Sequence, residues 1–215
     1  YQWNKRTRDG FLKAIEHFQE AIDRDPSYAL AYAGLADAYN VLGYYNYLPP
    51  RDAYPKAKAA AMRALAIDES LAQAHASLGY TRLFFDWDWA GAESAFLRAI
   101  ELDPSYASAH QWYAWCLLVM RRMDEMIEAM RTALQLDPLS LIINAHMGYA
   151  LFWAGRFDDA LEQLARTQAL DPNFALKAPI TRVRACYADG GTFVDVNGTV
   201  VVNGGGAEQC SSNGG

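Results

Sequence analysis

A proline recurs at a fixed interval in this chain and constrains its fold more than any other feature. Pro104, Pro138 and Pro172 lie 34 residues apart, and each follows an aspartate. Pro26 belongs to the same series, while Glu69 takes the corresponding place in the unit between. A fixed period of this length is typical of repeat arrays, in which each unit buries its apolar face against its neighbours. The chain is therefore predicted to build an extended surface, and its function is to be sought on that surface rather than in a catalytic pocket.

Each unit carries two helical patterns. In the second helix small and bulky residues alternate at steps of three and four, as in Ala92, Phe96 and Ala99, which places one apolar stripe on one face. In the first helix a small residue such as Gly79 recurs, and we expect two backbones to approach closely there. The proline then ends the unit because it cannot continue a helix. Ser27, Ser105 and Ser140 are expected to cap helices. Turns within the units are expected at Gly43 and Gly155.

This two-helix pattern resembles the tetratricopeptide repeat (TPR) family over residues 8 to about 176. The resemblance implies an all-α fold, a right-handed α-solenoid of antiparallel helix pairs. The expected divisions of the array, which spans 1–176, are a half repeat at 1–26 and repeats at 27–69, 70–104, 105–138 and 139–172.

Two intervals depart from the period. Pro26 and Glu69 are 43 residues apart, nine more than the period, and we place the surplus at Tyr44–Pro50. Pro50 suits the first position of a helix, which is expected to run from 50 to 67 with a kink at Pro55. The next interval, from Glu69 to Pro104, is 35 residues.

The composition changes after residue 176. Residues 177–202 are interpreted as a degenerate fifth repeat or a β-hairpin, with a helix over about 180–188 as one reading. Asn197-Gly198 predicts a two-residue type I′ turn between strands. Residues 203–215 are rich in Gly, Ser and Asn, and a flexible tail is expected.

At a finer level three segments resemble the repeat tails of large bacterial signalling proteins. They are Trp3–Thr7, Tyr47–Arg51 and Phe85–Trp89. In that subset the array accompanies a winged-helix domain, a nucleotide cyclase or a Ser/Thr kinase. No such effector domain is present, so the resemblance implies the sensory or regulatory part of a larger protein, and a fragment or processed product is expected.

Bulk properties exclude several classes of partner. The net charge of −6 argues against nucleic acid, whose phosphates need a basic face. The longest apolar run, Trp112–Met120, has nine residues and is too short to span a bilayer. The three cysteines are too few and too scattered for a disulfide framework, which favours a cytoplasmic location.

No enzyme is predicted. His75 and His110 occupy equivalent repeat positions, about one helix spacing (~10 Å) apart, which is too far for a shared metal. Asp86 and Asp88 alternate with tryptophans in a turn, where Asp88 is expected to cap a helix. No metal and no cofactor are predicted.

In TPR arrays the first helices line the concave face, and the resemblance implies a partner-binding groove there. The predicted lining is Asp37, Asn40, Gln73, Tyr80, Phe84, Gln111, Trp112, Trp115, His146, Tyr149, Phe152 and Trp153. The expected ligand is a protein or peptide, such as an amphipathic helix or an apolar segment. Its affinity is expected to depend weakly on salt. It could also be part of another domain of the same protein. Replacing Trp112 and Trp115 with alanine is expected to weaken binding without unfolding the array, unless these rings are core.

Two alternatives remain open from the sequence. One is an architectural module whose open repeat ends associate into oligomers or fibres. The other is an enzyme with a site between repeats, for which the sequence offers no convergent polar groups.

Overall fold

The structure, a computed structural model, describes residues 8–172, 174, 192–194 and 200–202. The helices are α1 (Arg8–Arg24), α2 (Ala29–Tyr44), α3 (Pro50–Ile67), α4 (Ala72–Thr81), the π-helical turn η2 (Arg82–Asp86), α5 (Trp89–Leu102), α6 (Ala107–Val119), α7 (Met123–Leu136), α8 (Leu141–Trp153) and α9 (Phe157–Leu170). Two strands follow, β1 (Thr192–Val194) and β2 (Val200–Val202). The expected segments 177–191 and 203–215 lie outside the described residues.

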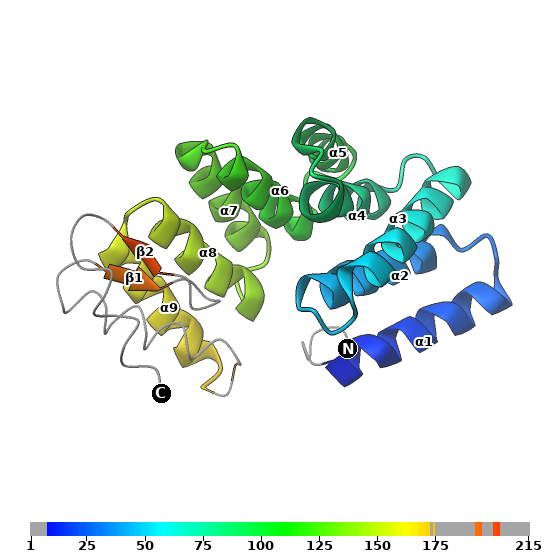
Figure 1. Ribbon diagram of the computed structural model, residues 1–215, viewed down its shortest axis with the longest axis horizontal. Coiled ribbons are helices and arrows are strands. Elements are labelled where there is room, and N and C mark those ends of the chain that lie inside the picture. Colours follow the sequence, from blue (N-terminus) through cyan, green and yellow to red (C-terminus); the bar gives the residue numbers. More distant parts are fainter. Residues whose placement is uncertain (1–7, 173, 175–191, 195–199, 203–215) are drawn as a thin grey trace. The chain divides into compact units, whose positions relative to one another are not determined.

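Short turns join the helices into pairs that pack along their lengths: α2 with α3, α4 with α5, α6 with α7 and α8 with α9 (Figure 1). The chain forms two compact units, one ending at Leu136 and one beginning at Asp137. In the first unit α1 packs on α2, α2 and α3 on α4, and α5 on α6. The all-α solenoid predicted from the repeat is thereby confirmed.

The nine surplus residues of the first full repeat are spread over three elements. Compared with α6 and α7, the helix α2 is longer by three residues (16 against 13) and α3 by four (18 against 14). The connection 45–49 supplies the other two, because it has five residues where 120–122 has three. The surplus therefore lies only partly at the predicted place, Tyr44–Pro50. Pro50 begins α3 as expected, and Pro55 lies inside it.

The 35-residue interval has a separate cause. The single extra residue is absorbed at the end of α4, where the chain widens into η2. A π-helical turn is the usual way in which a helix accommodates one inserted residue, and such turns are frequent at functional sites. The extra residue therefore changes which side chains the end of this first helix presents.

Aspartate, more than proline, organises the turns between repeats. Asp25, Asp68 and Asp103 each accept the backbone N–H of the serine two residues later, at 2.9, 2.9 and 3.0 Å, and its hydroxyl at 2.6, 2.7 and 2.7 Å. The turn after α3 has this geometry although Glu69 replaces the proline. The aspartate side chain mimics a backbone turn, which explains why the proline is dispensable there.

Of the three serines predicted to cap helices, only Ser140 does so. Ser27 and Ser105 bond to these aspartates, and the N-cap residues of α2 and α6 are the tyrosines that follow, without side-chain capping bonds. Ser140 does cap α8, where its hydroxyl oxygen accepts from the N–H of Ile143 at 3.5 Å.

The recurring small residue of the first helices makes room for a side chain rather than for a backbone. A Cβ added to Gly79 would lie 2.9 Å from the ring of Phe96, and one added to Gly148 would lie 2.6 Å from the side chain of Leu164. Gly43 was expected in a turn but lies inside α2, whereas Gly155 follows α8 with φ +76° as a turn glycine should.

The two strands form an antiparallel hairpin, as one of the sequence readings proposed. Val194 pairs with Val200 and Thr192 with Val202. The two-residue turn predicted at Asn197-Gly198 lies in 195–199, outside the described residues.

Candidate partner-binding surface

The end of α2 and the connection after it form a rigid platform. The backbone N–H groups of Tyr47 and Leu48 both donate to the carbonyl of Leu42, at 2.9 and 3.2 Å, and Tyr45 donates to Val41 at 3.0 Å. The chain thus folds back on the last turn of α2. Its tyrosines are held in place although they belong to an insertion.

The π-turn places two phenylalanines on different neighbours. Phe84 lies against Tyr44, with ring centroids 5.1 Å apart, and against Tyr80 at 4.6 Å. Phe85 stacks on Tyr54 of α3 at 5.2 Å and 21° between planes. One inserted residue therefore joins the end of α4 both to α2 and to α3.

These rings belong to a continuous series that crosses three first helices. Tyr47 contacts Tyr45 (5.9 Å), Tyr45 contacts Tyr44 (5.3 Å), Tyr44 contacts Tyr80 (6.2 Å), and Tyr80 meets Trp112 of α6 at 5.0 Å. With Phe84 they form what we call the aromatic row: Tyr44, Tyr45, Tyr47, Tyr80, Phe84 and Trp112. Such ring pairs contribute about 0.5–1.5 kcal/mol each beyond their buried area.

The row changes from core to surface along its length. Trp112 and Tyr80 are buried, at 6% and 5% exposed, whereas Tyr44 and Tyr47 are 45% and 37% exposed. Its open end therefore lies at the turn between α2 and α3. Exposed aromatic rings that continue a buried series can serve as anchors for a binding partner.

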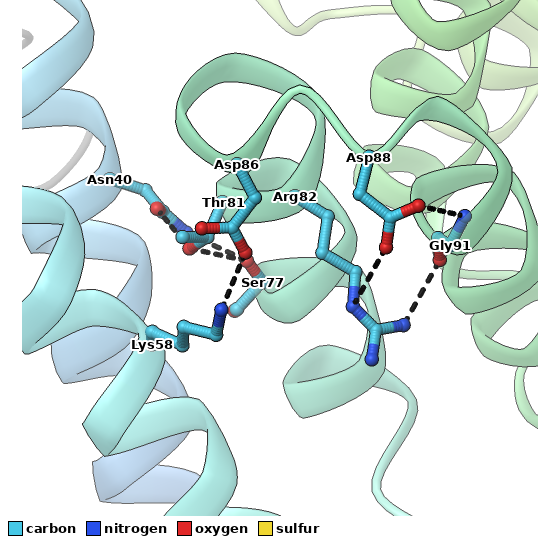
Figure 2. Close-up of polar contacts among 8 residues, drawn as sticks. All are labelled: Asn40, Lys58, Ser77, Thr81, Arg82, Asp86, Asp88 and Gly91. Atoms are coloured by element: carbon cyan, nitrogen blue, oxygen red, sulfur yellow. Dashed lines mark hydrogen bonds and ion pairs between the residues drawn. The ribbon is translucent and has the colours of Figure 1, made fainter.

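A buried polar ladder sets the register of α2 on α4 beneath this row. The amide of Asn40 donates to the carbonyl of Ser77 at 2.9 Å, and the hydroxyl of Thr81 donates to the Asn40 amide oxygen at 2.8 Å (Figure 2). The single proton of the Ser77 hydroxyl is shared between two acceptors, the carboxylate of Asp37 and the carbonyl of Gln73 at 2.9 Å. Buried polar groups satisfied in this way fix one arrangement of the two helices.

The first helices carry almost no charge. Within α2, α4, α6 and α8 the sole Asp, Glu, Lys or Arg is Asp37, which is occupied by Ser77. Desolvation by the surrounding side chains raises the pKa of Tyr44, with a smaller contribution from Tyr45. The Tyr44 hydroxyl thus stays a neutral hydrogen-bond donor at physiological pH.

The twelve predicted lining residues fall into three groups. Five are buried: Asn40, Tyr80, Gln111, Trp112 and Phe152. Six are half-buried: Asp37, Gln73, Phe84, Trp115, His146 and Tyr149. Trp153 is 38% exposed.

Two of the five buried residues have a clear role inside the fold. Asn40 has no exposed surface and serves the polar ladder. Trp112 packs in a core cluster with Tyr54, Tyr80 and Phe96, so its loss will cost stability. Of the tryptophan pair, the half-buried Trp115 is the better probe of binding.

The four predicted residues on α8 belong to the second unit and have contacts of their own. Phe152 lies edge-on to Trp153 and to Phe157, with centroids 5.5 and 5.9 Å apart. His146 and Tyr149 are neighbours at 6.1 Å. These rings form a local aromatic group on the pair α8 and α9.

The sequence interpretation missed Tyr44, Tyr45 and Tyr47 as site residues. Their signal was available, because three tyrosines stand in four positions within the surplus of the first repeat. An insertion that is aromatic rather than polar indicates a surface element with a contact to make.

The histidines and aspartates considered as catalytic or metal-binding candidates make structural hydrogen bonds instead. The Nε2 atoms of His75 and His110 lie 2.9 and 3.0 Å from the carbonyls of Glu69 and Pro104, so both imidazoles tie a first helix to the preceding turn. Asp88 caps α5 by accepting from the N–H of Gly91 at 2.9 Å, as predicted. Among the described residues no group of three or more His, Cys, Asp or Glu side chains could hold a metal ion. In that same part of the chain, none of the helices is both long and apolar enough to cross a bilayer.

A family model for the tetratricopeptide repeat matches residues 6–45 and 88–140. These two segments belong to the tetratricopeptide repeat family. The unmatched stretch between, 46–87, contains the lengthened α3 and the turn η2, two of the places where the period is broken. No curated protein matches the chain.

Solved TPR structures share the fold. A thermophilic TPR protein of Thermus thermophilus is 19% identical with a TM-score of 0.64, covering 84% of this chain and 90% of its own. YrrB, a TPR protein with an unusual peptide-binding site, is 21% identical with a TM-score of 0.50, covering 77% and 80%. MamA is 23% identical with a TM-score of 0.52, covering 80% and 94%. Sequence identity at this level shows a shared fold and no more.

Proposed function

We propose that this TPR array is a non-catalytic scaffold that binds an apolar segment of a protein partner on its aromatic row. The observation that supports the proposal is the row itself, buried at Trp112 and open at Tyr44 and Tyr47. A segment laid on the open end would extend a ring series that is already rigid. Rigid aromatic anchors bind at low cost in conformational entropy.

The lack of charge on the first helices favours one kind of ligand. A ligand that contacts them meets rings, amides and hydroxyls, with Asp37 as the single carboxylate. The apolar face of an amphipathic helix fits such a surface, whereas a charged peptide would lose hydration without a partner. Binding at the row is therefore expected to change little with salt.

Peptides selected from a displayed library against the whole chain provide the test. The double variant Tyr44→Ala/Tyr47→Ala is expected to weaken their binding about tenfold or more, as removal of anchor rings does. Met62→Ala is the matched control, since it removes an apolar side chain that is 56% exposed on α3 and lies outside the row. Equal affinities for the parent and the double variant would refute the assignment of the site.

The proposal includes a regulatory role within a larger bacterial signalling protein. It is supported by the likeness of Tyr47–Arg51 and Phe85–Trp89 to such repeat tails, and these two segments occupy the inner turns of consecutive repeats. The reading frame around the coding sequence tests it. An adjoining winged-helix, cyclase or kinase domain is expected, and a complete gene without an effector domain would contradict it.

A further inference from the structure

Trp87 has a backbone conformation and an exposure that the fold does not explain. It follows η2 with φ 56° and ψ 24°, in the left-handed region, and its side chain is 73% exposed. A bulky residue is unfavourable there because its Cβ crowds the following carbonyl. An indole so exposed gains little packing in return.

The corresponding turns of the other repeats show what the position requires. Asn46, Arg121 and Gly155 also have positive φ, at 54°, 60° and 76°. Asparagine and glycine are the residues that tolerate this region best. The fold would therefore accept glycine at position 87.

Polar contacts hold the turn that carries Trp87 (Figure 2). Asp86 accepts from the ammonium of Lys58 at 2.6 Å, which ties the turn to α3. Asp88 caps α5 through Gly91, and Arg82 donates to the Gly91 carbonyl at 3.1 Å while its Nε lies 4.0 Å from the Asp88 carboxylate. The tryptophan is thus presented on a fixed backbone.

We propose that Trp87 and Trp89 form a second docking surface, for an arginine- or lysine-bearing segment of a protein partner. Trp89, two residues on, is 43% exposed. Tryptophan is the ring that attracts cations most strongly, and these two alternate with Asp86 and Asp88, whose carboxylates pair with Lys58 and Arg82 and can each accept a further donor. The net charge of −6 also draws a basic segment toward the chain. This surface differs from the uncharged aromatic row, and salt will weaken binding here.

An NMR titration of the whole chain with a capped Gly-Arg-Gly-Arg-Gly peptide tests the proposal. The indole N–H signal of Trp87, identified by its loss in Trp87→Gly, is expected to shift with added peptide. The same peptide with citrulline in place of arginine keeps the shape without the charge and is expected to produce no shift. Trp87→Gly is expected to weaken binding about two- to fivefold, the range typical of exposed cation–π contacts.

Stability separates this role from a structural one. Relief of backbone strain offsets the greater unfolded-state entropy of glycine, so Trp87→Gly is expected to melt at the parent temperature or higher. Arg121→Gly is the matched control, because it makes the same change at the next turn and should bind no more weakly than the parent. The proposal is overturned by unchanged binding in Trp87→Gly, by equal binding of the citrulline peptide, or by a marked fall in the melting temperature of Trp87→Gly.

Discussion

The buried ladder between α2 and α4 predicts a specific pattern of stability changes. Thr81→Val removes the hydroxyl that the Asn40 amide oxygen accepts at 2.8 Å and leaves that oxygen buried without its donor. An orphaned buried acceptor costs about 1–3 kcal/mol. Asn40→Leu removes two hydrogen bonds, but the Thr81 hydroxyl keeps the Ser77 carbonyl as an acceptor at 3.3 Å, so about 1–2 kcal/mol is expected.

The double variant decides whether the ladder acts as a unit. With both polar partners replaced by apolar groups of similar shape, no acceptor is orphaned, and the double change should cost about 1 kcal/mol less than the two single changes together. Urea unfolding followed by circular dichroism measures all four proteins. Strictly additive costs, or single changes below about 0.5 kcal/mol, would refute the reasoning that these bonds fix the register of the two helices.

Three further results are expected from the packing and the titrations. Trp112→Ala should destabilise by about 3–5 kcal/mol in thermal or urea unfolding, and Trp115→Ala by clearly less, because the first ring is 6% exposed and the second half-buried; equal costs would contradict this. Burial raises the pKa of the Cys116 thiol to about 12, so a thiol reagent at pH 8 should leave it unmodified in the native chain and label it on unfolding; rapid native labelling would be the contrary result. The hydroxyl and N–H of Ser27 hold the pKa of Asp25 below its ordinary 3.8, so this turn stabilises the fold above that pH and the effect is lost as pH falls through the lowered pKa; Ser27→Ala should therefore flatten the acid limb of the melting temperature against pH, and an unchanged limb would refute the contribution.

Much of the fold followed from spacing, because each repeat signal reports a local requirement. The helix over 50–67 begins and ends as predicted, since proline and aspartate act on the backbone within a few residues. The single extra residue before Pro104 was visible as an interval of 35, but nothing local in the sequence says that a π-turn absorbs it. In the structure the turn packs Phe84 and Phe85 on the rings of Tyr44 and Tyr54, which lie far away in the chain.

The surface was harder to predict than the fold. The first helices are apolar on every side, so their pattern does not distinguish the face packed on the second helices from the face left open. Asn40 and Trp112 were therefore assigned to the surface although both are buried. The tyrosines of the insertion escaped notice because the family pattern has no position for them.

The central claim is that the aromatic row receives an apolar segment at its open end. Intermolecular NOEs between a library-selected peptide and the whole chain test it most directly. The account predicts contacts from apolar peptide side chains to Tyr44, Tyr47 and Phe84, with an affinity that stays within about twofold between roughly 0.05 and 0.5 M salt. Contacts confined to the second helices, or an affinity that collapses with salt, would contradict it.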